Sequence, residues 1–208
     1  MAPPPPAPAP ARMSAEARRE QLLDVAKAIV VRRGFHAVSI EGVARDAGIS
    51  RPIVYGHFGD LAGLLEALIA REGQRALAHL GAVLPAALAQ REQAERLEAA
   101  LGGYLEAVRA DPDTWRLVLM PQEGAPRTLH EHIARGRAAV VAQLAAALGT
   151  SDDPAVATPD PELTARLLTA FADEAARLLL EDADRYPAAR ILALARWFLA
   201  RVAAGGRG

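Results

Sequence analysis

The stretch SIEGVARDAGISRPIVYGHFGD, from Ser39 to Asp60, predicts two short helices joined by a tight corner. In its first half, apolar residues recur at the i, i+3, i+4 and i+7 spacing of one buried helix face: Ile40, Val43, Ala44 and Ala47. Ser39 is a candidate N-cap for this helix. Gly48 is expected to end it, because glycine takes a left-handed backbone turn without a Cβ penalty.

The second helix of this stretch is short and polar on its outer side. Ser50 can cap it, and Pro52 suits a first turn in which the backbone N–H has no partner. We expect Ile53 and Phe58 to point inward. A helix, a glycine turn and a polar-faced second helix form the helix-turn-helix signature of major-groove DNA binding. The candidate DNA-binding residues are Ser39, Ser50, Arg51, Pro52, Tyr55 and His57.

A longer run, G-F-x-x-x-S-I-x-x-V-A-x-x-A-G-I-S-R-x-x-V-Y-x-H-F from Gly34 to Phe58, resembles the DNA-binding domain of the TetR family of transcriptional regulators. The resemblance implies an all-helical homodimer. Its N-terminal domain would bind a palindromic double-stranded DNA operator, and its C-terminal domain would bind a small ligand and dimerise. One departure concerns a lysine that in the family commonly follows the aromatic residue by three positions and binds a phosphate. Here Leu61 stands at that position, directly after Asp60.

The composition indicates a helical globular protein. Of the 208 residues, 51% are hydrophobic and 24% are charged, and alanine and leucine predominate. The absence of cysteine excludes disulfides and thiolate sites. No apolar run approaches the roughly 20 residues that span a bilayer, so a cytoplasmic protein without a membrane partner is expected. The net charge is −1, but residues 12–60 carry +2 and the remainder −3, which mildly favours a DNA-binding N-terminal module.

The predicted fold class is all-α, with about nine helices. We divide the chain into a disordered Pro/Ala tail without the features of a secretory signal, a helix-turn-helix domain and a helical ligand-binding and dimerisation domain: residues 1–11, 12–60 and 61–208. Pro85 is expected to end or kink the first helix of the last domain, and a flexible loop is expected over residues 149–160. The other helices are predicted over residues 14–33, 61–84, 94–110, 114–120, 128–148, 161–182 and 188–204.

An enzymatic role finds little support in the sequence. In the run His130-Glu131-His132, residues two apart on a helix point about 200° apart, so the imidazoles cannot share one metal ion. The chain has no H-x-x-x-H, G-x-S-x-G or Walker-type glycine loop, and we predict no catalytic residue, metal or cofactor. Two alternatives to a DNA-binding regulator stay open. One is a protein-interaction module that keeps the helix-turn-helix as structure only, which Leu61 favours, and the other is a small-molecule-modifying enzyme.

The aromatic residues of the C-terminal domain suggest a ligand cavity. The candidates are Tyr104, Trp115, Leu119, Met120 and Phe171, with polar contributions from Arg116, Gln143 or Asp173. The segment has no dense cluster of Arg or Lys suited to a polyanion, so we expect a small, largely apolar effector. Ordinary core packing of these residues is the alternative.

The last two helices carry apolar residues on more than one stripe, which predicts packing against a second subunit. The candidate dimer residues are Leu163, Leu167, Ile191, Leu194 and Phe198. A monomer that buries both faces internally is the alternative. Together these features predict a ligand-responsive regulator, a repressor by its family resemblance, that acts as a homodimer.

Overall fold

The computed structural model describes residues 13–88, 93–120, 125–149 and 158–205. These residues form nine α-helices and one short 3-10 helix, and no strand is found among them. The all-α prediction is therefore confirmed, whereas the Pro/Ala tail and most of the predicted loop over residues 149–160 lie outside the described residues. The helices are α1 (Ala15–Arg33), η1 (Phe35–Ala37), α2 (Ile40–Asp46), α3 (Arg51–Phe58), α4 (Leu61–Leu88), α5 (Gln93–Ala110), α6 (Pro112–Leu119), α7 (Arg127–Gly149), α8 (Pro161–Glu181) and α9 (Ala188–Gly205).

Several helices begin at a side chain that accepts a hydrogen bond from the first turn. Ser14 accepts from the Ala17 N–H at 3.1 Å, and Asp160 accepts from the Leu163 N–H at 2.9 Å. Asp111 caps α6 in the same way, and Pro112 occupies its first turn. The Asp111-Pro112-Asp113 run thus separates α5 from α6 and starts α6, because aspartate caps the helix and proline needs no N–H partner there.

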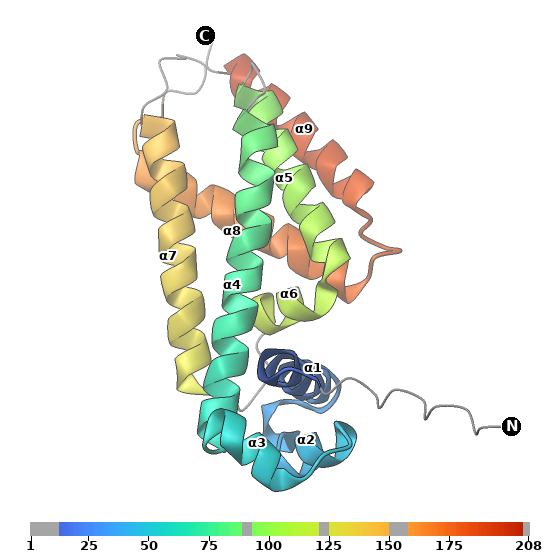
Figure 1. The fold of residues 1–208 in the computed structure, drawn as a ribbon. Coiled ribbons are helices and arrows are strands. Elements are labelled where there is room, and N and C mark those ends of the chain that lie inside the picture. Colours follow the sequence, from blue (N-terminus) through green and yellow to red (C-terminus); the bar gives the residue numbers. More distant parts are fainter. Residues whose placement is uncertain (1–12, 89–92, 121–124, 150–157, 206–208) are drawn as a thin grey trace, which may run out of the picture.

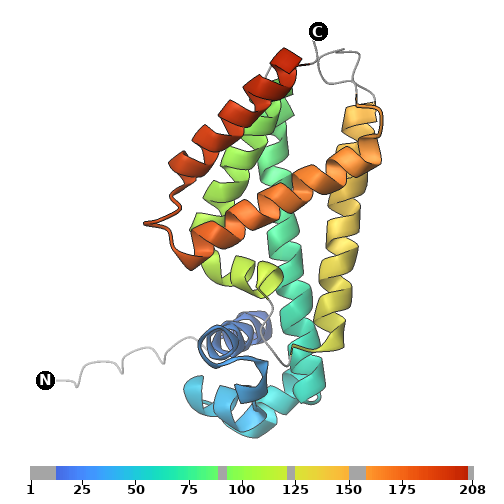
Figure 2. The ribbon, with the colours of Figure 1, turned by 180° about the vertical axis from the view of Figure 1, so that it is seen from behind.

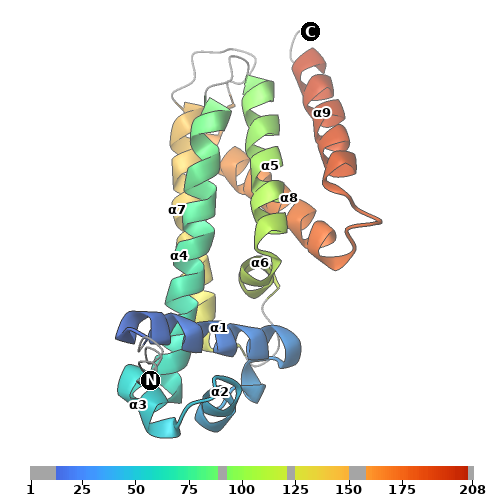
Figure 3. The same ribbon diagram turned by 45° about the vertical axis from the view of Figure 1, so that its right-hand side comes forward.

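Helix α4 connects the two parts of the molecule. It runs from the small N-terminal bundle of α1–α3 through the length of the larger helical domain (Figure 1). It extends to Leu88, so of the two outcomes predicted for Pro85, an end or a kink, the end is wrong. Helices α5 and α7 pack along α4, and α8 crosses the same domain on the face seen from behind (Figure 2). Helix α6 lies between α5 and α1, where the two parts of the molecule meet (Figure 3).

Two main hydrophobic cores follow this division. The first gathers buried side chains of α1, α2 and α3 against the beginning of α4, and Leu22, Leu23, Val43, Val54 and Leu64 are all fully buried in it. Leu117 of α6 and Leu129 of α7 also belong to this core, so the larger domain packs directly on the smaller one. The second core joins α4, α5, α6, α8 and α9. In the described part of the chain no single helix is long and apolar enough to span a membrane; α3 and α4 pass that test only as a pair, bent by 61°.

Candidate functional site

Helices α2 and α3 form the predicted helix-turn-helix. The Ser39 hydroxyl accepts a hydrogen bond from the Gly42 N–H at 3.0 Å, which fixes the start of α2. Gly48 has a φ of 68° and makes the corner, a conformation that residues with a Cβ rarely adopt. Ser50 is the N-cap residue of α3 by its backbone, and its hydroxyl makes no capping hydrogen bond. The corner therefore fixes the angle between α2 and α3. The Ser50 hydroxyl is not used for capping.

Helix α3 presents most of its surface to solvent. Val54 is its buried residue, and Phe58, one turn later, packs partly on the same core. The expectation that Ile53 points inward is wrong, because its side chain is 44% exposed. Residues four apart share a helix face, so the pair of Val54 and Phe58 leaves Ile53 on the outer side. Arg51, Pro52 and Tyr55 are exposed, and His57 is half-buried.

Arg51 is held by an acidic neighbour. Its guanidinium donates a hydrogen bond to Glu41 of α2 at 3.1 Å, and both side chains are well exposed. A backbone N–H at the start of α2 and the Arg51 guanidinium lower the pKa of Glu41. A DNA phosphate or base edge would therefore compete with Glu41 for Arg51.

The start of α4 is capped by an acid. The Asp60 carboxylate accepts a hydrogen bond from the Gly63 N–H at 2.8 Å. A Cβ on Gly63 would lie 2.2 Å from the Phe58 carbonyl oxygen, so only glycine lets the chain turn this closely from α3 into α4. A helix N-terminus ordinarily attracts phosphate. Here Asp60 occupies that end, and Leu61 replaces the basic side chain that the resemblance leads one to expect.

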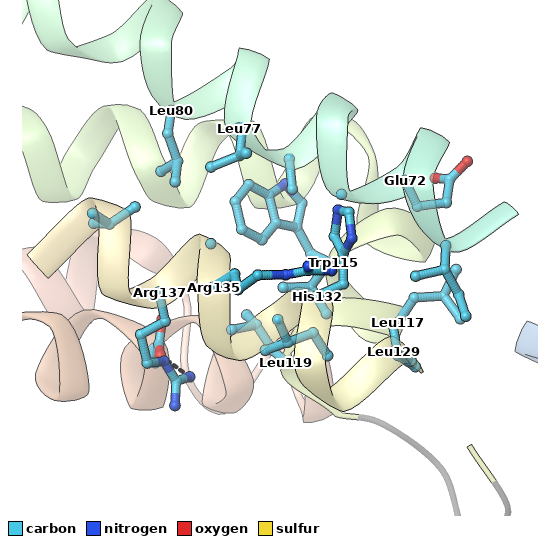
Figure 4. A pocket seen from close by; sticks show the side chains of 18 of the residues that line it. Glu72, Leu77, Leu80, Trp115, Leu117, Leu119, Leu129, His132, Arg135 and Arg137 are labelled. Carbon is cyan, nitrogen blue, oxygen red and sulfur yellow. Dashed lines mark hydrogen bonds and ion pairs between the residues drawn. The ribbon is translucent and has the colours of Figure 1, made fainter. Parts of the chain in front are cut away.

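A cavity of about 330 Å³ lies in the larger domain between α4, α6, α7 and α8. Figure 4 shows Trp115 between the ribbons of α4 and α7, with Leu77 and Leu80 reaching from α4. The volume falls within the range of about 300–1,000 Å³ that is usual for small-molecule sites. Most of the lining is apolar, and it includes Leu68, Ile69, Leu77, Leu80, Leu117, Leu119, Leu129, Ile133 and Val140.

The structure brings together three of the five residues proposed for ligand binding. Tyr104, Trp115 and Leu119 line the cavity, and the Tyr104 and Trp115 rings meet edge to face at 5.0 Å. Met120 does not line it and packs on the second core instead. Phe171 is 42% exposed and also lies outside the lining, because α8 turns this residue outward.

The polar groups at the cavity differ from those expected. Asp173 lines it as predicted, whereas Arg116 and Gln143 do not. Asp173 accepts a hydrogen bond from the Tyr104 hydroxyl at 3.4 Å and pairs with Arg137. Burial raises the pKa of Asp173, although Arg137 opposes this, and burial together with Asp173 raises the pKa of Tyr104. Sequence reasoning missed Glu72, Arg135 and Arg137, for which only helical spacing could have given a signal.

A buried polar cluster links the two parts of the molecule next to this cavity. Lys27 of α1 donates to Glu72 of α4 at 2.9 Å, to Asp111 at 2.9 Å and to Thr114 of α6 at 2.7 Å. The Thr114 hydroxyl also contacts Glu72, and Arg71 donates to the same carboxylate at 2.8 Å. Burial raises the pKa of Glu72, but the bonds from Thr114 and Lys27 outweigh it and leave that pKa below its usual range. Glu72 is 2% exposed and also lines the cavity.

An apolar surface covers the outer sides of α8 and α9. Ten large hydrophobic side chains are exposed in the described part of the chain, and six of them lie on these two helices: Leu163, Leu167, Phe171, Leu194, Trp197 and Phe198. On α8 they recur every four residues and so form one stripe. Ile191, proposed for the same interface, is instead buried in the second core at 7% exposure.

The histidine run carries no metal site. Among the residues that the structure describes, no group of three or more His, Cys, Asp or Glu side chains is placed to hold a metal ion. His130 lies on the exposed side of α7 near the Pro126 carbonyl, while His132 lines the cavity.

Residues 22–68 match the family model for bacterial regulatory proteins of the tetR family, and residues 93–205 match that for the tetracyclin repressor-like C-terminal domain. The chain belongs to the TetR family of helix-turn-helix transcriptional regulators. Its relatives are regulators rather than enzymes.

The curated relatives are similar to this chain over about half of its length. The transcriptional activator FasR of Mycolicibacterium smegmatis is 30% identical over 107 residues, which are 51% of this chain and 48% of that protein. The transcriptional regulator BetI of Serratia proteamaculans is 37% identical over 92 residues, 43% of this chain and 44% of its own. The chain thus spans about half the length of the curated relatives it matches.

Solved structures match over nearly the whole chain. A TetR-like regulator from Rhodococcus sp. RHA1 is 27% identical with a TM-score of 0.66, over 94% of this chain and 98% of that one. A tetR-family regulator from Streptomyces coelicolor is 28% identical with a TM-score of 0.66, over 93% and 83%. The two-part all-helical fold is therefore that of the family.

Proposed function

We propose that the protein is a ligand-responsive repressor that binds a palindromic DNA operator as a homodimer. Each subunit would place α3 in the major groove of one half-site, and the two half-sites would lie about 34–36 Å apart. The exposed outer side of α3 supports this function, since Arg51 and Tyr55, a cation and a phenol one turn apart, are both exposed.

The side chains proposed to bind DNA have different roles. Arg51 reads a base edge, because its fork of donors can bind a guanine with two hydrogen bonds. Tyr55 and His57 bind phosphates, as side-chain donors commonly do. Ser39, Ser50 and Pro52 lie at the helix starts that approach the backbone. The Glu41 carboxylate beside Arg51 must be displaced for the first contact, which favours DNA that offers Arg51 a bidentate partner over DNA that offers only phosphate.

The observation that carries the regulatory part of the proposal is the position of Glu72. This residue borders the cavity, and its carboxylate binds Lys27 of α1 at 2.9 Å. A ligand that moves α4 or α6 at the cavity must therefore disturb a buried bond to the DNA-binding module. A dimer with altered spacing of its two α3 helices would bind the operator less tightly, by a coupling free energy of typically about 1–3 kcal/mol.

The second subunit would cover the apolar surface on α8 and α9. A contiguous patch of this kind is uncommon on a monomer that stays in water. Two-fold pairing of the same surface on both subunits would bury Leu163, Leu167, Leu194 and Phe198 together. Phe171 and Trp197 join this surface by their exposure.

The direction of regulation is the finer part of the proposal. The relative from Mycolicibacterium smegmatis is named an activator, and those named BetI are named only regulators. We propose repression from the family resemblance, and a ligand that weakens operator binding would then relieve it. Because a regulator acts where its operator DNA is, the proposed location of the protein is the cytoplasm.

A mobility-shift assay tests the function directly. The probe is DNA from upstream of the protein's own gene, and the competitor is scrambled DNA of equal length and composition. We expect a dimer-sized shift that survives scrambled competitor and that weakens as salt rises. The matched control is the Arg51→Ala, Tyr55→Ala double variant. Equal shifts of native and scrambled DNA by the unaltered protein would instead favour an interaction module that keeps the helix-turn-helix as structure only.

A further inference from the structure

The charged residues that line the cavity differ in whether they have partners. Glu72 is bound by Lys27, Arg71 and Arg75, the last at 3.3 Å. Arg137 pairs with Asp173. These contacts neutralise three charged residues of the cavity lining: Glu72, Asp173 and Arg137.

Arg135 of α7 is the exception. It lines the cavity, and among the described residues it forms no hydrogen bond or ion pair. With the other charges at the cavity paired, Arg135 leaves one positive charge that the protein does not balance there. Arg135 is an exposed residue, so water can reach its five donors, and the apolar lining beside it supplies no acceptor that would compete with an anionic ligand.

His132 adds a second donor next to Arg135. The two residues are three apart on α7, and side chains three apart on a helix are neighbours. The His132 ring is seated against Gly73 of α4, where a Cβ would lie 2.6 Å from ring atoms, so a glycine is required for this approach. Figure 4 shows both side chains extending from α7, whereas Leu77 and Leu80 extend from α4.

We propose that the effector is an apolar molecule with a single carboxylate, bound by Arg135 and His132, with its apolar body among Leu77, Leu80 and Trp115. This rests on the proposed function, in which the cavity is the effector site. Arg135 supplies two parallel donors that match a carboxylate. A multiply charged anion is disfavoured, because Glu72 and Asp173 border the same cavity and Arg135 is its one lining cation without an ion-pair partner among the described residues.

The test compares ligands that share a body and differ in the head group. The probes are decanoate, 1-decanol and decylammonium, together with 2-naphthoate and 2-naphthalenemethanol, and binding to the full-length protein is measured by calorimetry. We expect a carboxylate to bind about tenfold more tightly than its alcohol, as a hydrogen bond to a charged group allows. Decylammonium should bind least tightly. The preference for carboxylate should shrink at high salt.

Variants assign the preference to Arg135. Arg135→Gln should remove the advantage of the carboxylate and leave alcohol binding unchanged, while Arg135→Lys should keep part of it. Arg127→Gln is the matched control, because Arg127 lies on the same helix, is exposed and pairs with Glu131 at 2.8 Å away from the cavity. Circular dichroism establishes that each variant is folded.

The outcomes separate this inference from the proposed function. Alcohols that bind as well as carboxylates and release operator DNA would overturn the carboxylate and leave the effector site standing. A carboxylate preference that survives Arg135→Gln would overturn the role of Arg135. If none of the probes binds in the cavity or changes operator affinity, both the carboxylate and the effector role of this cavity are wrong.

Discussion

At the scale of single residues, the DNA-facing surface is set by which side chains remain free to move. Arg51 is tied to Glu41 by one exposed ion pair, a kind of contact that contributes little to folding and is readily exchanged. Tyr55 is exposed and has no such acidic neighbour in the described part of the chain. We therefore expect DNA binding to be most sensitive to Arg51, whose proposed exchange of Glu41 for a base edge would select the sequence.

Replacing Arg51 tests that role. Arg51→Ala should weaken operator binding by about 1–3 kcal/mol and relax the preference at one base pair. Glu41→Gln should act in the opposite direction, with a severalfold tighter complex, because it frees Arg51 and removes a negative charge near the phosphates. Titration of operator and single-base variants measures both. Arg51→Ala protein that discriminates the operator from scrambled DNA as well as the parent does would contradict this role.

Leu61 is the other residue whose identity bears on DNA binding. It is half-buried against the first core, next to the Asp60 cap of α4. Leu61→Lys should retain much of that packing through its hydrocarbon stem and add a phosphate contact. The slope of log affinity against log salt should then steepen by about 0.9. Leu61→Gln, which is similar in length and neutral, is the control and should leave the slope unchanged.

At the scale of helices, α1, α4 and α6 meet in the buried cluster around Glu72. Three helices from two functional parts of the chain each contribute a side chain to it: Lys27, Glu72 and Thr114. Charges buried in this way require all their partners, because a single unpaired charge in the interior is costly. The cluster therefore fixes α1 against the larger domain in one arrangement.

Removal of Glu72 should show this cost. Glu72→Ala leaves Lys27 and Arg71 without their shared carboxylate, and we expect a loss of about 3–5 kcal/mol of stability. Glu72→Gln should lose less, since its amide oxygen can still accept from Lys27. Urea unfolding measures both, and Glu131→Ala on the surface of α7 is the control. A loss for Glu72→Ala no larger than that for Glu131→Ala would mean that the cluster does not hold the domains together.

At the scale of the whole molecule, acid should weaken the junction between the two parts. The pKa values of Glu72 and Asp111 lie below their usual values of 4.5 and 3.8 in the folded protein. A lowered folded pKa contributes stability above the unfolded value, and that stability is lost as pH falls through the folded value. Asp173, with a raised pKa, acts in the opposite direction.

The expected pH dependence follows from the two lowered groups. The urea midpoint should fall as the pH drops below about 4.5, and the fall should be shallower for Glu72→Gln, which lacks the titrating group. Parallel unfolding series for the two proteins over the same pH range make the comparison. Identical pH profiles would show that Glu72 is not responsible for the acid sensitivity.

The proposed assembly of two copies also belongs to the scale of the whole molecule. Phe198→Arg or Leu194→Arg places a charge on the apolar surface of α8 and α9, where burial against a partner would leave it unpaired. We expect sedimentation to show a dimer for the parent and a shift toward monomer for these variants. Ala138→Arg, at an exposed position on α7, should leave the dimer intact. A parent protein that is monomeric at micromolar concentration would remove the basis for a palindromic operator.

The N-terminal module was predictable from the sequence because its signals are local. A cap at Ser39, a glycine at the corner at Gly48 and apolar residues at helical spacing each act within a few positions of the chain. Their outcome depends little on what packs elsewhere, so the helix-turn-helix and the all-α class were predicted correctly. The one local error, Ile53, arose because Val54 and Phe58 compete for the same buried side of a short helix.

The sites of the larger domain depended on tertiary structure. Phe171 and Ile191 are both apolar residues on long helices, and periodicity alone could not say which faces outward. The crossing of α8 behind the domain exposes Phe171, and the packing of α9 on α5 buries Ile191. The cluster of Lys27, Glu72 and Thr114 joins residues up to 87 positions apart, and so does not exist until the helices are assembled. The sequence by itself determined the family and the DNA-binding helix, whereas only the fold decided the cavity lining, its unpaired Arg135 and the bond that ties the cavity to α1.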